Sequence, residues 1–122
     1  MDAAHFERIV EQAIARIPPE LSRYLENVLI TVQPSPSPEL LAEIGYAPDE
    51  SLFGLFTGVP LNERSPFDPP LYPATIYIFQ EPLESLGLSR AELIEEIEIT
   101  VVHEIAHFFG FDEEELAALG YG

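Results

Sequence analysis

The chain has 122 residues, 47% of them hydrophobic, and its 22 acidic residues against five arginines and no lysine give a formal net charge of −17. This length fits one domain over residues 1–122, and the charge argues against nucleic acid and anionic membranes as partners while favouring cationic ones. Cysteine is absent, which excludes disulfides and thiolate metal ligands, so any metal site must use histidine and carboxylate.

The N-terminal part carries the signals of a helix, a helical turn and a strand. Apolar residues recur at helical spacing from Ala3 to Ile17, and Pro18-Pro19 ends that helix. A helical turn is expected over residues 20–25, and the β-branched run Val28–Val32 predicts a strand. His5 lies at the start of the first helix, where a surface histidine is expected rather than a metal ligand.

Three elements are expected in the middle of the chain: a short helix at 39–44, a strand at 52–57 and a strand at 74–79. Gly54 permits a bend or a close backbone approach in the first strand. Pro73 directly before the second strand indicates an edge strand. The proline-rich segment 62–73 is either a rim over an active site or an inert surface loop.

A long helix is predicted in the C-terminal third. Ser89 and Glu92 have the spacing of a capping box, so the helix begins near Arg90 and runs to Phe109. Its first turns carry four glutamates and should be solvated, namely Glu92, Glu95, Glu96 and Glu98. Apolar residues surround the axis from Ile99 to Phe111, so the last turns should be buried. A short helix over residues 113–119 should follow.

The last turns of this helix contain the motif His103-Glu104-x-x-His107. Residues four apart share one helix face, so the two imidazoles can bind one metal ion, which makes a zinc half-site. Glu104 projects beside them and can take a proton from a metal-bound water, as a general base. The alternative is a hydrogen-bonded cluster in the core, because buried polar groups must be satisfied in one way or the other.

Gly110 can adopt the left-handed conformation that ends a helix and turns the chain back, so a third ligand is expected just beyond it. These residues resemble the zincin metallopeptidases, specifically the short bacterial zincin-like proteins with the pattern H-E-x-x-H-x-x-G-x-x-D. The resemblance places the third zinc ligand at Glu113, with Asp112 as the alternative and Glu114 or Glu115 behind them. The same carboxylates could instead form the solvated first turn of a helix.

The resemblance implies an α+β fold, with a small mixed β-sheet packed on a long active-site helix and on an N-terminal helix. It implies zinc-dependent hydrolysis of peptide or protein substrates, and one of the two later strands would pair with extended peptide. The group that stabilises the oxyanion stays open between Tyr121, Tyr77 and Tyr72.

Two other functions compete with the peptidase. One is a zinc-binding domain that interacts with proteins without cleaving them, since the chain is small and its only methionine is Met1, which leaves it without a Met-turn. The other is an acidic scaffold for basic proteins, which explains the charge but not the motif. With no basic-then-apolar leader and no apolar run of membrane-spanning length, a cytoplasmic protein is expected.

Overall fold

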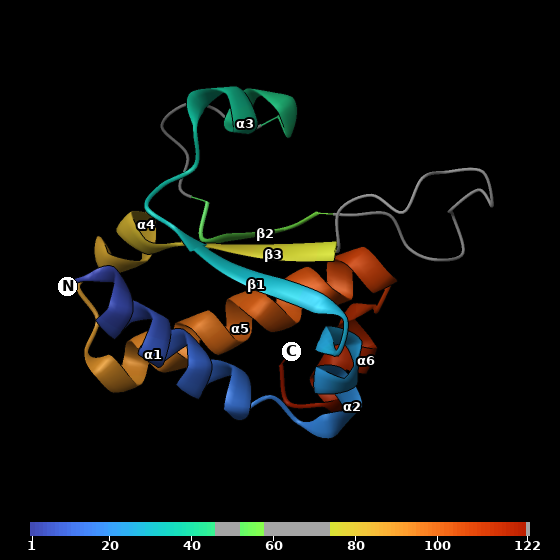
Figure 1. Cartoon of the computed structure of the whole chain (residues 1–122). Helices are drawn as coiled ribbons and strands as arrows, with labels where there is room; N and C mark the ends of the chain where they lie inside the picture. The colour runs from blue at the N-terminus through green and yellow to red at the C-terminus, as the bar shows by residue number, and fades with distance from the viewer. Residues whose placement is uncertain (46–51, 58–73, 122) are drawn as a thin grey trace.

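The computed structural model describes residues 1–45, 52–57 and 74–121, which form an α+β fold (Figure 1). Its elements, in chain order, are α1 (Ala3–Ala15), α2 (Pro19–Ser22), the 3-10 turn η1 (Arg23–Leu25), β1 (Val28–Gln33), α3 (Pro38–Glu43), β2 (Gly54–Thr57), β3 (Ala74–Phe79), α4 (Gln80–Glu84), α5 (Arg90–Phe109) and α6 (Glu113–Ala118). The expected fold class is confirmed: a small mixed sheet packs on the long helix α5, beside which α1 lies.

The sheet has the strand order β1-β3-β2. β1 runs parallel to β3, with Val28 opposite Ala74, and β2 runs antiparallel to β3, with Phe56 opposite Ile76. The expectation that residues 74–79 form an edge strand is therefore wrong, because β3 is central. β3 spans Ala74–Phe79 and contains no proline, so every residue of this central strand has a backbone N–H.

The two faces of the sheet carry different clusters of apolar side chains. Ile76 and Ile78 of β3 belong to the main core, which α1 and α5 cover. Phe79 belongs to a smaller cluster with Leu41 of α3, and Tyr77 packs against that cluster. The alternation along β3 therefore separates the α5 side of the sheet from the α3 side.

α5 begins and ends as expected. Ser89 and Glu92 form a capping box, in which Ser89 Oγ accepts from Glu92 N at 3.2 Å and Glu92 Oε1 accepts from Ser89 N at 3.0 Å. Gly110 ends the helix in the left-handed conformation, with φ 79°. Its N–H and that of Phe111 both donate to the carbonyl of Ala106, which satisfies an otherwise unpaired helix terminus.

The distribution of burial along α5 differs from the expectation at both ends. Glu98, expected in solvent, is only 8% exposed, because it lies on the same stripe as the buried residues Ile97 and Val101. His103 and His107, expected in a buried segment, are exposed. The core covers only one face of the helix, so its last turns are amphipathic rather than buried all round.

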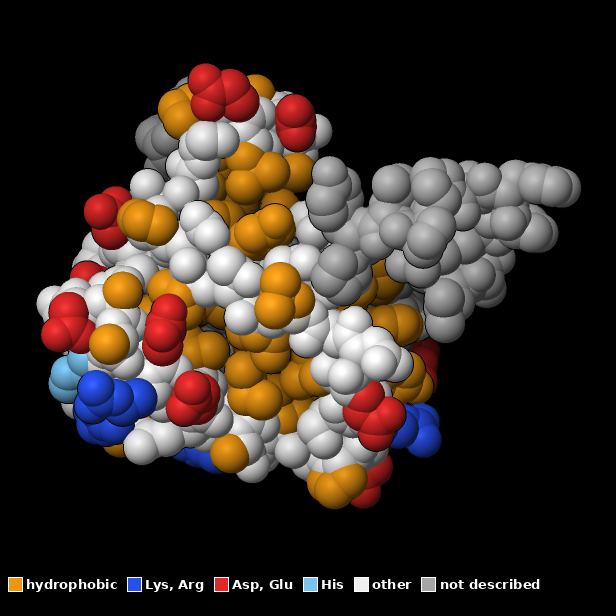
Figure 2. Space-filling view, in the orientation of Figure 1, with side chains coloured by type: hydrophobic (Ala, Val, Ile, Leu, Met, Phe, Trp, Pro, Cys, Tyr) orange, Lys and Arg blue, Asp and Glu red, His pale blue; other side chains and the backbone are white. Residues whose placement is uncertain are grey.

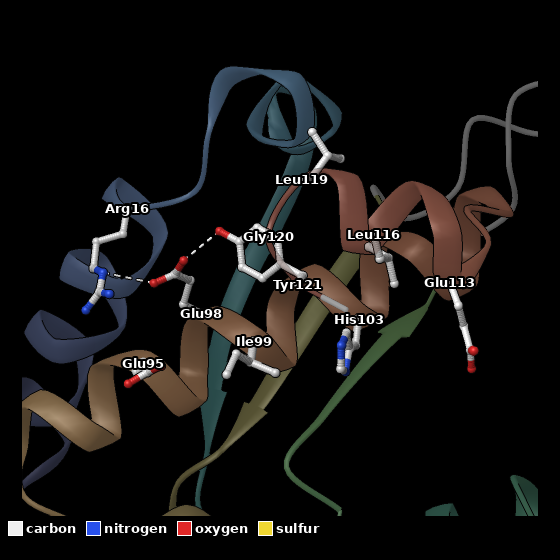
Figure 3. A pocket seen from close by; sticks show the side chains of 10 residues that line it. All are labelled: Arg16, Glu95, Glu98, Ile99, His103, Glu113, Leu116, Leu119, Gly120 and Tyr121. Carbon is white, nitrogen blue, oxygen red and sulfur yellow. Dashed lines mark hydrogen bonds and ion pairs between the residues drawn. The ribbon is translucent and has the colours of Figure 1, made fainter.

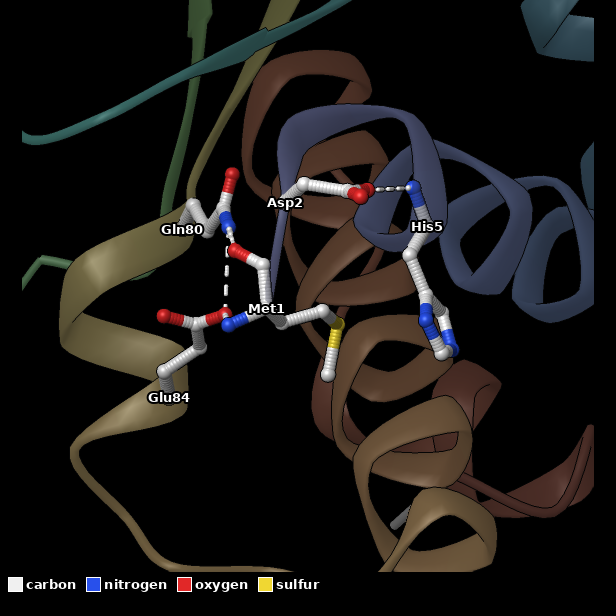
Figure 4. A network of polar contacts seen from close by, with 5 residues as sticks. All are labelled: Met1, Asp2, His5, Gln80 and Glu84. Carbon is white, nitrogen blue, oxygen red and sulfur yellow. Dashed lines mark hydrogen bonds and ion pairs between the residues drawn. The ribbon is translucent and has the colours of Figure 1, made fainter.

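The helix α4 has no counterpart among the expected elements. It contains Pro82 in its first turn, where proline is tolerated because those N–H groups have no partner within the helix. Glu81 N donates to Pro34 O at 2.8 Å, which ties α4 to the segment after β1. Figure 4 shows the neighbouring polar contacts, in which Gln80 Nε2 donates to Met1 O at 2.9 Å.

His5 is a surface histidine, as expected. Its backbone N–H donates to the side chain of Asp2, the N-cap of α1, at 2.7 Å (Figure 4). Its ring Nε2 lies 2.9 Å from Arg90 Nη1, at the start of α5. It therefore contacts the end of α5 opposite to His103 and His107.

A shallow groove runs between α1 and β1. It is lined by Val10 and Ile14 of α1, by Ile30 and Val32 of β1 and by the flanking Glu7 and Glu11, among others. Figure 2 shows hydrophobic side chains gathered across the middle of this view, with acidic side chains around them. None of the helices in the described ranges combines the length and apolar character needed to cross a membrane.

Candidate metal centre

The two motif histidines occupy the solvent side of the last turns of α5. Ile105 and Ala106, which stand between them in the sequence, are buried in the core, whereas His103 and His107 are exposed. Four residues apart on a helix, they have Cβ atoms about 6 Å apart on one face. Both histidines are therefore exposed to solvent on the same face of α5.

Glu104 sits beside the histidines and turns toward β2. Its Oε2 accepts a hydrogen bond from the backbone N–H of Phe56 at 3.0 Å. Burial raises the pKa of the Glu104 carboxyl, while the hydrogen bond from the Phe56 N–H and the electrostatic interaction with His107 and His103 act in the opposite direction. A raised pKa brings a carboxylate nearer to the range in which it works as a general base.

β2 reaches Glu104 because Gly54 lets it approach α5 closely. A Cβ at Gly54 would stand 2.9 Å from Thr100 Cγ2 and 3.1 Å from Tyr77 O. The sequence allowed either a bend or a close backbone approach at Gly54. The structure shows the close approach. Further along β2, the ring of Phe56 stacks on Phe108 of α5, with centroids 4.0 Å apart. These contacts fix the strand against the helix on both sides of the Glu104 hydrogen bond.

A pocket of about 920 Å³ opens beside His103, between α5, α6 and the residues that follow α6. Figure 3 shows that His103 and Glu113 both line it, projecting to the same side without meeting. The structure thus brings the expected third ligand to the pocket that His103 borders.

The donors expected to bind zinc are His103, His107 and one carboxylate just after Gly110. No group of three histidine, aspartate or glutamate side chains converges on one point within the described residues. Asp112 is engaged as the N-cap of α6, where its Oδ1 accepts from Glu115 N at 2.8 Å, and Glu115 Oε1 accepts from Asp112 N at 3.2 Å. Glu113 is exposed and stands outside this capping box. The pair of imidazoles with one nearby carboxylate fits zinc by the chemistry of its donors.

The tyrosines proposed for the oxyanion lie in different places. Tyr77 packs on the α3 side of the sheet, away from α5. Tyr121 lines the pocket, but its hydroxyl donates to Glu98 Oε2 at 2.5 Å. Burial is the larger cause and this hydrogen bond the second of a shift that raises the pKa of Tyr121 to about 12. Tyr72 and the segment 62–73 lie outside the described residues.

Two groups at the site have roles that the motif did not indicate. The hydrogen bond from Phe56 to Glu104 comes from the backbone N–H, so the identity of the residue at position 56 could not predict it. The burial of Glu98 could have been predicted from the sequence. The residue pairs 97/98, 101/102 and 105/106 lie at helical spacing on one face of α5, and every other member of these pairs is apolar. A glutamate on this face indicates a buried carboxylate.

A helix that presents two histidines and a glutamate at this spacing, next to the edge of a small sheet, defines a class of metal-dependent hydrolases. The chain belongs to the zincin-like metallopeptidase family, whose model matches residues 25–122. This confirms the resemblance seen in the motif and supports a metallopeptidase function in general terms. The family is typically zinc-dependent, and its substrates are peptides or proteins. A comparison with curated proteins finds no match.

Proposed function

We propose that residues 1–122 act as one domain that hydrolyses peptide bonds, with zinc bound by His103, His107 and Glu113 and with Glu104 as the general base. Zinc, when bound, would supply a Lewis acid that polarises the scissile carbonyl and makes water more acidic. Glu104 would accept the proton of the attacking water and later donate it to the leaving amine.

The observation that carries this proposal is the position of Glu104. The carboxylate is half-buried beside two exposed histidines and is oriented by a backbone hydrogen bond rather than left mobile in solvent. A site that only stabilised the fold would prefer four protein ligands and would need no base at this position. The orientation of Glu104 therefore favours catalysis over the non-catalytic zinc-binding alternative.

The substrate would lie along β2. Residues of an antiparallel strand alternate between its two edges, so the Phe56 N–H that reaches Glu104 points away from β3. In the described sheet, β2 has a partner strand on one side only. An extended peptide added to this edge would run past the Glu104 carboxylate, and the net charge of −17 favours basic peptides.

The test compares the wild type with three variants over a broad peptide library. Glu104→Gln keeps an oxygen that can accept from Phe56 N–H, so it should retain about one zinc per chain while kcat/KM falls by about 10²- to 10⁴-fold. His103→Ala should lose the metal. Glu11→Gln, which removes an exposed carboxylate from α1, serves as the matched control and should cleave like the wild type.

Each outcome bears on one part of the proposal. A wild-type protein that binds zinc and cleaves nothing would favour the non-catalytic zinc-binding domain. A wild-type protein that binds no zinc would remove the site altogether. Comparing the zinc content of Glu113→Ala and Asp112→Ala identifies the third ligand, because only replacement of the true ligand should lower the zinc content.

A further inference from the structure

α6 is a short helix that buries little of its surface against the rest of the protein. It spans six residues, and Leu116 is its one buried residue. Its first residue is Glu113, the carboxylate assigned above to zinc. The position of α6 relative to α5 therefore decides whether Glu113 reaches the ion that His103 and His107 would bind.

The segment after α6 is tied to both helices through Tyr121. The backbone N–H of Tyr121 donates to Leu116 O at 2.8 Å, which folds the segment back onto α6. Its hydroxyl donates to Glu98 Oε2 at 2.5 Å, which joins it to α5 (Figure 3). One tyrosine thus connects the helix that carries Glu113 to the helix that carries His103.

Glu98, which accepts the hydrogen bond from Tyr121, is itself held in place by burial and by an ion pair. It is 8% exposed, and its Oε1 lies 2.9 Å from Arg16 Nε, just after α1. This contact is an ion pair without hydrogen-bond geometry, since Oε1 has no hydrogen-bond partner in the described part of the chain. A buried carboxylate held between a cation and a hydroxyl cannot move far without losing both.

We infer that Arg16, Glu98 and Tyr121 form a latch that holds α6 beside α5, so that Glu113 lines the same pocket as His103 and can supply its carboxylate to a metal ion bound there. This inference rests on the proposed zinc site. The three residues do not touch the reacting atoms and act through the placement of a ligand. The pKa of Tyr121, raised to about 12, keeps its hydroxyl a proton donor over the whole neutral range.

The test measures zinc affinity of the metal-free protein by competition with a chromogenic chelator. Tyr121→Phe removes only the hydroxyl and should weaken zinc binding by about 10- to 100-fold, the usual effect of losing a group that orients a ligand. Tyr24→Phe is the matched control, because its hydroxyl contacts Arg23 at 3.3 Å on the surface, and it should bind zinc like the wild type. Glu98→Gln, which can still accept from Tyr121, should keep more affinity than Glu98→Ala.

A double-mutant cycle separates positioning from general stability. In a Glu113→Ala background, Tyr121→Phe should cause no further loss of zinc affinity, because the ligand it positions is gone. The visible spectrum of the Co²⁺-loaded Tyr121→Phe protein should likewise approach that of Glu113→Ala. Wild-type affinity in Tyr121→Phe, or an equal loss in both backgrounds, would overturn the latch and leave the zinc site intact. A wild-type protein that binds no zinc would overturn the latch together with the proposed function.

Discussion

Replacing Gly54 by alanine should weaken the contact between β2 and α5. The new Cβ would stand 2.9 Å from Thr100 Cγ2, closer than carbon atoms tolerate. That methyl group cannot swing aside easily, because Thr100 Oγ1 is held by a hydrogen bond to Glu96 O at 2.8 Å. Gly54 does not have a positive φ, so alanine would otherwise suit the strand.

The magnitude follows from two opposing effects. Overpacking costs about 1–3 kcal/mol, and replacing a strand glycine by alanine recovers about 0.5–1 kcal/mol of backbone entropy. We expect Gly54→Ala to lower the free energy of unfolding by about 1.5 kcal/mol. Thr100→Ser removes the clashing methyl and keeps the hydroxyl, so in that background the cost should fall by about 1 kcal/mol.

The assay is urea unfolding of the four proteins of this cycle, followed by far-ultraviolet circular dichroism because the chain has no tryptophan. A displaced β2 also moves Phe56 N–H away from Glu104, so Gly54→Ala should lose peptidase activity beyond its loss of stability. If Gly54→Ala is as stable as the wild type, or if Thr100→Ser leaves its cost unchanged, the close approach is not what this glycine provides.

Two further predictions concern the ends of α5 and α6. Ser89→Ala removes the side chain that accepts from Glu92 N and should cost about 1 kcal/mol in urea unfolding, whereas an unchanged midpoint would mean that the cap contributes nothing. Tyr121 has a folded pKa of about 12 against 10.0 as its ordinary value, so between these pH values the unfolded chain releases its proton first and stability falls as pH rises. The phenolate difference spectrum between wild type and Tyr121→Phe should titrate near 12. A midpoint near 10 would contradict the part-buried hydrogen bond to Glu98.

The features that the sequence predicts well are those with local causes. Ser89 and Glu92 determine where α5 begins, and Gly110 determines where it ends, because caps act through the residues next to them. The spacing of His103 and His107 likewise places both on one face of the helix. The family match over residues 25–122 agrees with what this local motif indicates.

The features that the sequence predicts poorly depend on distant partners. Whether β3 is central depends on pairing with β1, whose partner residues lie far away in the chain, as Val28 and Ala74 do. The exposure of His103 and His107 depends on which face of α5 the core covers. The sequence does not indicate that face, because apolar residues surround the helix axis in this segment. α4 is only five residues long and gives no periodic signal.

The strand order also has a consequence for the time course of folding. β1 and β2 do not pair with each other, and both pair with β3, which is the last of the three to be synthesised. α1 packs on α5, which comes later still. The described strands before residue 74 therefore have no sheet partner, and α1 lacks the helix on which it packs, until β3 and α5 have been synthesised. Such long-range pairing is slow compared with local helix formation, so assembly of the sheet has to wait for β3.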